Sequence, residues 1–343
     1  MKKFSRSIWY CEKARRSFQR RRVRQGVSFL KKLVLVSPCK AIMLVVEAAF
    51  KILVPLRLRS AALLGYKRTF RVTPPFYRET KGCGINSEPR DEKVAVTLTS
   101  YPKRIGTVHK TINTLLNQTY RPDLVVLWLA PEQFPNREND LPKQLLRLRE
   151  YGLTIDWCRD IRSFKKLIPS LKKYPDALLV TADDDIYYPP DWLEKLVVAH
   201  RKYPKCVICH GAHRIRFGKD GALLPYRKWK FGTMNCVPSF DLFVTCGAGA
   251  LYAPGVLHED VTDESRLEEL CPFADDIWFW AMAVLNNSPI KVVDNHVKRI
   301  HPIYEADNSS ALATLNMMEG NRNDIQLAKV LKLYPQIIAK LRT

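Results

Sequence analysis

Three consecutive aspartates, Asp183, Asp184 and Asp185, are the residues of this sequence best placed to do chemistry. They follow a short apolar run, residues 177–181, that is typical of a buried strand. Adjacent carboxylates repel one another, and a divalent cation among them reduces this repulsion. We therefore predict a magnesium or manganese site, at which the metal also binds the oxygens of a nucleoside diphosphate and offsets the charge that grows as it leaves.

Helix capping is the simpler interpretation of these aspartates, because Asp191 and a helical pattern follow soon after them. A helix start needs only one capping residue, however, and Pro189 and Pro190 separate the three aspartates from that helix. This spacing favours the metal interpretation.

The elements that must position these residues are short apolar strands that alternate with helices. Strands are expected at 94–99, 124–129, 153–157 and 177–181, and helices at 107–118, 141–151 and 164–174. This alternation predicts an α/β fold with a Rossmann-like, mostly parallel sheet flanked by helices. Such sheets bind ligands at the carboxyl ends of their strands, where the three aspartates would lie.

The phrase TADDDIYYPPDWLEKL at 181–196 resembles the Asp-x-Asp segment of GT-A-fold glycosyltransferases. It is most similar to bacterial family-2-like enzymes that assemble lipopolysaccharide and capsular polysaccharide. Three further phrases fit this group in the expected order: TSYPKR at 99–104, CGAGALY at 246–252 and ADDIW at 274–278. The resemblance spans about residues 93–330. It implies a GT-A domain at 93–343, with a nucleotide-binding half at 93–210 and an acceptor half at 211–343.

The family implies transfer of a sugar from a nucleotide-diphosphate donor to a saccharide or lipid-linked saccharide acceptor, with inversion at the sugar carbon. Carried over by position, Asp185 would bind the metal, and Asp183 and Asp184 would contact ribose or metal. Asp276, with Asp275 as the alternative, would take the proton of the acceptor hydroxyl. Capping of the apolar helix that follows is the simpler role for this second acidic pair.

The remaining site residues are expected to contact the donor or the metal. By the resemblance, the nucleotide is held by Ser100, Tyr101 and Arg104. Lys166, next to Lys165, would meet the donor phosphates, with a solvated helix face as the alternative. Some GT-A enzymes complete the metal shell with a late histidine, for which His301 and His296 are candidates and a surface histidine is the simpler interpretation.

Positive charge is concentrated at the start of the chain. Of the formal net charge of +22, residues 1–90 contribute +18, with 22 Lys+Arg against four Asp+Glu, so the remaining residues carry only +4. The main domain therefore needs no polyanionic partner, and we expect no nucleic acid to bind it. A nucleic-acid-binding protein that uses its basic N-terminal arm and a catalytically silent assembly subunit are the alternative functions.

Residues 1–66 form this basic and apolar arm, and residues 67–92, with several prolines and glycines, form a linker. Charged residues interrupt the apolar part too often for a bilayer span, and within 40–54 they form one narrow stripe. The arm therefore predicts a helix at an anionic membrane interface, with a buried helical appendage as the alternative. We expect a cytoplasmic protein, peripheral at the inner face of the membrane.

Nine cysteines are scattered without a disulfide framework or an export signal, which indicates a reducing compartment. Cys206 and Cys209, followed by His210, match the spacing of a haem attachment site, and with His213 they make a candidate zinc site. Because the two cysteines lie in an apolar run, buried strand cysteines are the default interpretation.

Overall fold

The computed structural model describes residues 73–233, 235–294, 301–303 and 321–342. These residues belong to one compact unit, Val72–Thr343. The predicted arm at 1–66, its membrane contact and the candidate ligand His296 lie outside the described residues. Within the described part of the chain, no helix is long and apolar enough to cross a bilayer.

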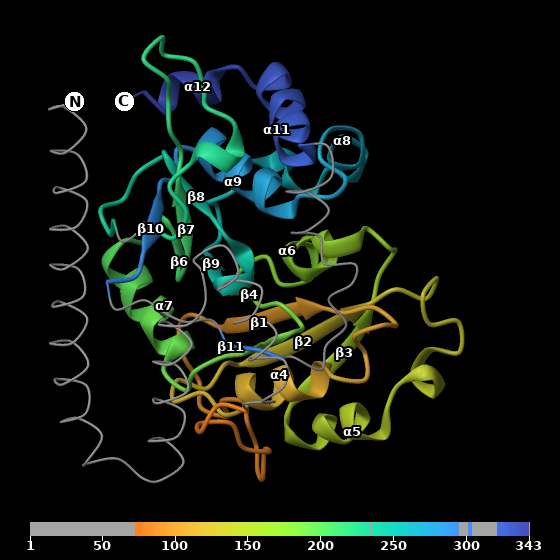
Figure 1. Cartoon of the computed structure of the whole chain (residues 1–343). Coiled ribbons are helices and arrows are strands. Elements are labelled where there is room, and N and C mark those ends of the chain that lie inside the picture. Colours follow the sequence, from red (N-terminus) through yellow and green to blue (C-terminus); the bar gives the residue numbers. More distant parts are fainter. Residues whose placement is uncertain (1–72, 234, 295–300, 304–320, 343) are drawn as a thin grey trace, which may run out of the picture. The chain divides into compact units, whose positions relative to one another are not determined.

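A seven-stranded sheet, in the order β10-β6-β9-β4-β1-β2-β3, forms the framework of the unit (Figure 1). Its strands are β1 (Val94–Thr99), β2 (Leu124–Leu129), β3 (Leu153–Trp157), β4 (Leu178–Thr181), β6 (Val207–Cys209), β9 (Ala250–Tyr252) and β10 (Ile290–Val292). Only β9 runs antiparallel to its neighbours, β4 and β6. The predicted α/β class with a mostly parallel, Rossmann-like sheet is confirmed, and the arrangement is consistent with a GT-A-like fold.

Each face of the sheet carries its own apolar core, because side chains alternate along the strands. Val94, Val96 and Leu98 belong to one core, and Ala95 belongs to the other. The first core is covered by α4 (Val108–Leu115), α5 (Lys143–Leu146) and α7 (Trp192–Lys202). The second is covered by α6 (Ile168–Lys173), α8 (Glu264–Leu270), α9 (Asp275–Leu285), α11 (Arg322–Leu333) and α12 (Gln336–Lys340).

The helix expected at 164–174 is broken into two pieces. A 3-10 helix, Arg162–Lys166, precedes α6. Pro169 lies in the first turn of α6 and has no N–H to donate, so an α-helix cannot extend back through it. The helices expected at 107–118 and 141–151 are also shorter, and the second of them ends in a 3-10 helix. The tighter turn at 162–166 determines where two lysines of the site lie.

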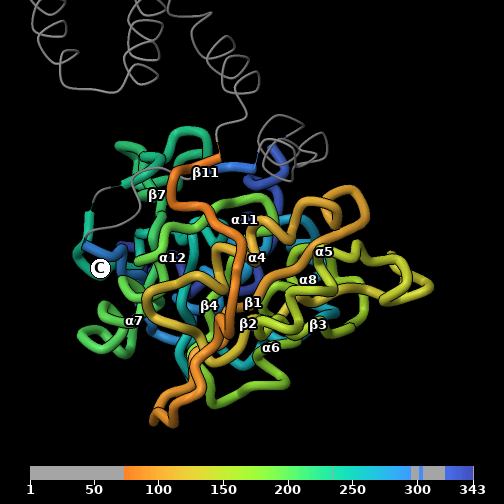
Figure 2. Tube along the Cα trace, turned by 90° about the horizontal axis from the view of Figure 1, so that it is seen from below, coloured from red at the N-terminus to blue at the C-terminus, as the bar shows by residue number. Residues whose placement is uncertain are grey.

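Two small antiparallel sheets accompany the main one. They pair β11 (His301–Pro302) with β5 (Ile186–Tyr187), and β7 (Ala212–Arg214) with β8 (Leu242–Val244). The segment 73–92 crosses α4 from the end near β11 towards the opposite edge of the sheet (Figure 2). It is fixed there by the Thr80 N–H, which donates to the Asn113 side chain at 2.8 Å.

Gly249 makes the turn that leads into β9. Its φ of 108° lies in the left-handed region, and an added Cβ would lie 2.4 Å from the indole nitrogen of Trp192. This buried indole also donates to the Ala248 carbonyl at 2.9 Å, so it both holds the turn by a hydrogen bond and packs against Gly249. The turn therefore requires a residue without a side chain.

Gly249→Ala is expected to lower the free energy of unfolding by about 3 kcal/mol, because backbone strain adds to overpacking against Trp192. Gly82→Ala is the matched control, since no atom lies within 4 Å of its added Cβ. Its effect should stay within about 0.5 kcal/mol. Urea denaturation measures both variants, and equal losses would show that Trp192 moves away at little cost.

Candidate active site

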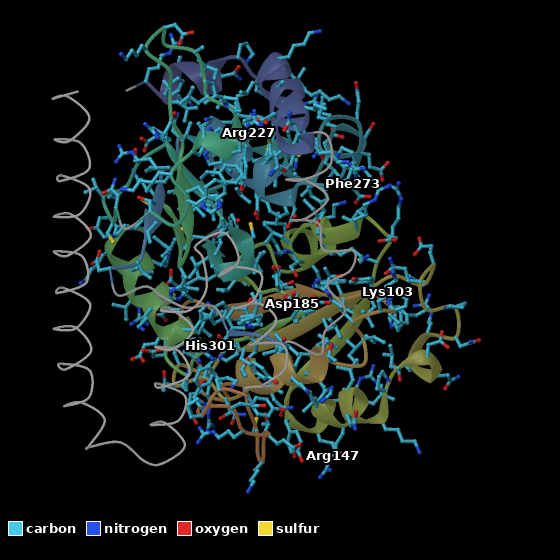
Figure 3. All side chains as sticks on the ribbon, viewed as in Figure 1. Lys103, Arg147, Asp185, Arg227, Phe273 and His301 are labelled. Atoms are coloured by element: carbon cyan, nitrogen blue, oxygen red, sulfur yellow. The ribbon has the colours of Figure 1, made fainter. Side chains whose placement is uncertain are left out.

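The three predicted aspartates lie at the carboxyl end of β4, beside the residues that follow β1. Parallel pairing places Thr97 next to Thr181, so Ser100 and the aspartates leave the sheet at the same edge. Since β9 runs the other way, the turn Cys246–Ala248 before it reaches this edge as well. Figure 3 shows Asp185 there, between the helices that cover the two faces.

Asp184 is buried and held by two donors. The Ser100 hydroxyl donates to it at 2.6 Å, and Nη1 of Arg104 donates at 2.7 Å. Burial raises the pKa of Asp184 above its ordinary value, although Arg104 and Ser100 act in the opposite direction. The same Arg104 nitrogen lies 3.1 Å from Asp185, and the Arg104 guanidinium lies 5.7 Å from the centre of the Tyr101 ring. Ser100 and Arg104 therefore contact the aspartates, and Tyr101 lies beside Arg104.

Lys166 connects the two acidic motifs. Its ammonium donates to Asp183 at 2.5 Å and lies 3.1 Å from Asp275 Oδ2. Burial alone would lower the pKa of Lys166, but Asp183 and Asp275 raise it well above its ordinary value. The neighbouring Lys165 is also buried and pairs with Asp160. The interpretation of these two lysines as a solvated helix face is therefore wrong.

Asp275 and Asp276 are held by side-chain and main-chain donors that the sequence did not reveal. The Ser163 hydroxyl donates to Asp275 at 2.9 Å, and the Cys246 N–H donates to Asp276 at 2.9 Å. Ala274 occupies the N-cap position of α9, so the capping role considered for this pair is wrong. Burial, and then the charge of Asp275, raises the pKa of Asp276 to about 7.

The residues Asp183, Asp184, Asp185, Asp275 and Asp276 together form what we call the acidic cluster. Two cations, Arg104 and Lys166, pair with this cluster. When all five carboxylates are ionised, these two cations leave three of the negative charges without compensation. Burial, and then Asp183, raises the pKa of Asp185 to about 7. A buried oxygen of Asp275 also lacks an aligned hydrogen-bond donor. This oxygen-rich, electron-rich set fits a hard divalent cation such as Mg²⁺ or Mn²⁺.

One group among the described residues already has the spacing of metal ligands. Cys246, Asp275 and Asp276 offer ligand atoms within 4.8 Å of one another. The Cys246 thiol is a poor ligand, however, because burial and the charge of Asp276 raise its pKa well above the ordinary value. The metal ligands predicted from the sequence, Asp183 and Asp185, stay a prediction.

The backbone pairing of β11 with β5 brings His301 to the neighbourhood of the aspartates. The Ile303 N–H donates to the Asp185 carbonyl at 2.7 Å. The His301 ring makes an edge contact with Phe76, at 5.2 Å between ring centres. In Figure 3 it is set apart from Asp185, so its role as a metal ligand stays a prediction.

The cysteines of the candidate zinc site are buried in and beside β6, as the default interpretation expected. His213 packs instead against Phe231, at 4.4 Å between ring centres. Within the described part of the chain, Cys206, Cys209 and His213 do not form a group with metal-ligand spacing.

Two further residues shape the site: Gly247, which belongs to the phrase at 246–252, and Tyr188, for which no role was predicted. The Tyr188 hydroxyl accepts from the Asp183 N–H and donates to the Gly247 carbonyl, both at 2.8 Å. An added Cβ on Gly247 would lie 2.2 Å from Asp183 Oδ2, so only glycine leaves room for that carboxylate. The run of small residues CGAGA was the available signal for Gly247, whereas nothing local distinguishes Tyr188 from the adjacent Tyr187.

Asp276→Asn is expected to stabilise the metal-free protein more at about pH 8 than at about pH 5. The folded state raises the pKa of Asp276 from 3.8 to about 7, so it favours the protonated carboxyl. The folded protein is therefore more stable while this carboxyl is protonated, and that part of its stability is lost as the pH rises through 7. Asparagine avoids that loss. The stability difference between variant and parent should therefore grow by about 2 kcal/mol over this range. Urea denaturation at both pH values measures it, and a constant difference would contradict the raised pKa.

Comparison with known proteins provides little beyond the geometry. No family model matches the chain, and no curated protein matches it either. The crystal structure of S. aureus TarS 1–349 is similar, with a TM-score of 0.40, 17% sequence identity and 70% of each chain covered. The chemistry of the site must therefore be inferred from its own residues.

Proposed function

We propose that this protein is a metal-dependent glycosyltransferase that moves a sugar from a nucleotide-diphosphate donor to a saccharide or lipid-linked saccharide. The observation that carries this proposal is the position of Lys166. Its single ammonium joins the aspartates after β4 to the acidic pair at the start of α9. Carboxylates suited to a diphosphate-bound cation thus lie next to a candidate general base. Stabilisation of the leaving diphosphate and removal of the acceptor's proton are the two functions that this sugar transfer requires.

The donor would bind at the edge formed by β1 and β4. Asp183 and Asp185 would hold Mn²⁺ or Mg²⁺, with His301 as a further candidate ligand. The metal, when bound, supplies positive charge against the leaving diphosphate. Arg104 would keep Asp184 and Asp185 oriented through the contacts described above, and Lys166 would add charge near the phosphates. The nucleotide itself would lie against Ser100 and Tyr101.

Asp276 would act as the general base. Its pKa of about 7 means that a substantial fraction is ionised at neutral pH and that it holds a proton well once it has accepted one. The Cys246 N–H donates to Oδ1 of Asp276, and the other carboxylate oxygen would receive the proton of the acceptor hydroxyl. Attack by that hydroxyl opposite to the leaving diphosphate inverts the sugar carbon.

The acceptor and the cellular location follow from the arm rather than from the site. A lipid-linked acceptor at the inner face of the cytoplasmic membrane would explain why a catalytic domain carries a basic, apolar segment that suits an anionic surface. Assembly of lipopolysaccharide or capsular polysaccharide is the corresponding process.

A thermal-shift screen of UDP, GDP, CMP, dTDP and their sugar conjugates, with and without Mn²⁺, tests the proposal. We expect one nucleoside diphosphate to raise Tm only when the metal is present, because binding to the folded state alone stabilises it. Asp185→Asn should abolish this shift. Asp176→Asn is the matched control, since it removes the same charge at the exposed opposite end of β4.

The screen also has an outcome that rejects the proposal. If no nucleotide shifts Tm in a folded sample, the donor site is wrong and the silent-subunit alternative gains support. A metal-dependent shift that survives in Asp185→Asn would keep the donor class and reject Asp185 as the ligand.

A further inference from the structure

The connection between β7 and β8 carries a local excess of positive charge. The chain leaves β7, turns back at 217–223 and returns to pair Lys230 with Arg214. We call residues 214–231 the basic hairpin. It contains six Lys+Arg and one aspartate, a net charge of +5, whereas residues 91–343 together carry only +4. The rest of that range therefore sums to −1, so the surplus positive charge of the main domain lies in this hairpin.

The cations of the basic hairpin are exposed and have few carboxylates near them. The exposed basic side chains are Arg214, Arg216, Lys219, Arg227, Lys228 and Lys230. Within the described part of the chain, only Arg214 among them forms an ion pair, with Asp241 at 2.8 Å. Arg214 and Lys230 lie directly opposite each other, joined by main-chain hydrogen bonds of 2.8 and 3.0 Å, and like charges in such positions destabilise a sheet. An ordinary solvated surface, in which both signs are interspersed, does not account for this arrangement.

Two exposed apolar side chains accompany these cations. Phe231 ends the hairpin with 41% of its surface exposed, and its ring packs against His213 at 4.4 Å and Tyr226 at 5.5 Å between ring centres. Val237, six residues further along the same connection, is 66% exposed. Basic residues together with exposed apolar side chains are typical of a membrane interface. A nucleic acid would stack its bases on the phenylalanine, but an aliphatic valine has no aromatic face to offer them.

The hairpin is fixed to the folded unit at three places. The Tyr226 N–H donates to Asp324 on α11 at 2.7 Å, and the Trp229 indole donates to the Leu224 carbonyl at 2.8 Å. At the turn, Arg342 donates to the Gly221 carbonyl at 2.9 Å. Figure 1 shows the hairpin beside α12, and Figure 3 shows Arg227 at this end of the unit. Because its shape is fixed in advance, binding would cost little conformational entropy.

We propose that the basic hairpin binds the surface of an anionic phospholipid bilayer, with its cations against the lipid phosphates and Phe231 in the interface. This contact belongs to the folded unit and is separate from the contact predicted for residues 1–66. It uses neither the donor nor the metal, so its failure would leave the proposed function standing.

The test sediments the full chain, without nucleotide or metal, with phosphatidylcholine vesicles that contain or lack phosphatidylglycerol. Arg227→Gln should lower the partition coefficient on the anionic vesicles about fivefold, and a further Lys228→Gln should lower it about fivefold again. These charge variants should also reduce the salt dependence, whereas Phe231→Ser should weaken binding and leave the salt dependence unchanged. Arg147→Gln is the matched control: it removes the same charge at an exposed arginine, which Figure 3 shows at the opposite end of the unit, and should change nothing.

A local measurement separates the hairpin from residues 1–66, which are predicted to hold the chain on the vesicles as well. Hydrogen exchange of the full chain should slow at 214–231 on anionic vesicles and not on neutral ones. Unchanged exchange there, or equal partition of Arg227→Gln and Arg147→Gln, would overturn the proposal.

Single-stranded DNA tests the other class of polyanion. If Arg227→Gln weakens binding of an oligonucleotide but not of vesicles, the hairpin is a nucleic-acid surface and the proposal is wrong. The variants change exposed side chains, so Tm should stay close to that of the parent and show that each is folded. The Tm shift with UDP and Mn²⁺ should persist in Arg227→Gln, which keeps this result distinct from the test of the donor site.

Discussion

Asp276→Asn is expected to lower the rate of sugar transfer by about a thousandfold, the usual contribution of a positioned general base. The amide cannot accept the proton of the acceptor hydroxyl, yet it can still accept the Cys246 N–H that holds the carboxylate at 2.9 Å in the parent. Metal-dependent donor binding should therefore stay within about twofold of the parent, because the loss concerns the transition state. Turnover and donor titration on the same sample measure the two effects.

Two results would contradict this role for Asp276. Near-normal turnover would move the base to another residue, first of all Asp275. A parallel loss of donor binding would indicate that Asp276 serves the metal site instead. Asp176→Asn is again the control, because it has the same chemistry at the far end of β4.

Lys166→Met is expected to lower the free energy of unfolding by about 3 kcal/mol at neutral pH, because it leaves the buried Asp275 and the half-buried Asp183 near one another without their cation. Saturating Mn²⁺ should recover much of this loss, since a divalent cation can replace the missing charge. The shift in Tm on adding Mn²⁺ should therefore be larger in the variant than in the parent.

Lys165→Met is the matched control for this experiment. Lys165 is as deeply buried as its neighbour, but its partner Asp160 lies outside the acidic cluster. The substitution should destabilise the protein, and Mn²⁺ should not reverse the effect. Equal recovery in both variants would show that the metal binds elsewhere, and absence of recovery in both would remove the support for a cation at the acidic cluster.

The sequence predicted β1 and β2 well because they are buried on both faces, whereas β3 is only half-buried and was indicated by its alternating apolar residues. The runs at 94–99, 124–129 and 153–157 form strands with those bounds. The sequence also placed Asp183, Asp184 and Asp185 at the correct edge, since this follows from the direction of β4 alone. Ser100 and Arg104 contact Asp184 at this edge, and their role in holding the nucleotide stays a prediction.

What the sequence did not reveal depends on contacts between distant segments. The burial of Lys166 needs Asp183 and Asp275 on either side of it, and these residues are 92 positions apart. Nothing in the local sequence distinguishes Ser163, because its role depends on the hydrogen bond to Asp275 at the start of α9. The break before α6 had a local signal, Pro169, which the apolar periodicity of 164–174 concealed.

The reversed strand β9 has a consequence for how the chain is made. It separates β4 from β6, so β6 and then β10 can join the sheet only after residues 250–252 have been synthesised. Until then β4 presents an unpaired edge just behind three aspartates. During translation these charges would oppose the association of that edge with other chains. The residues suited to chemistry in the finished protein would thus also protect the nascent one.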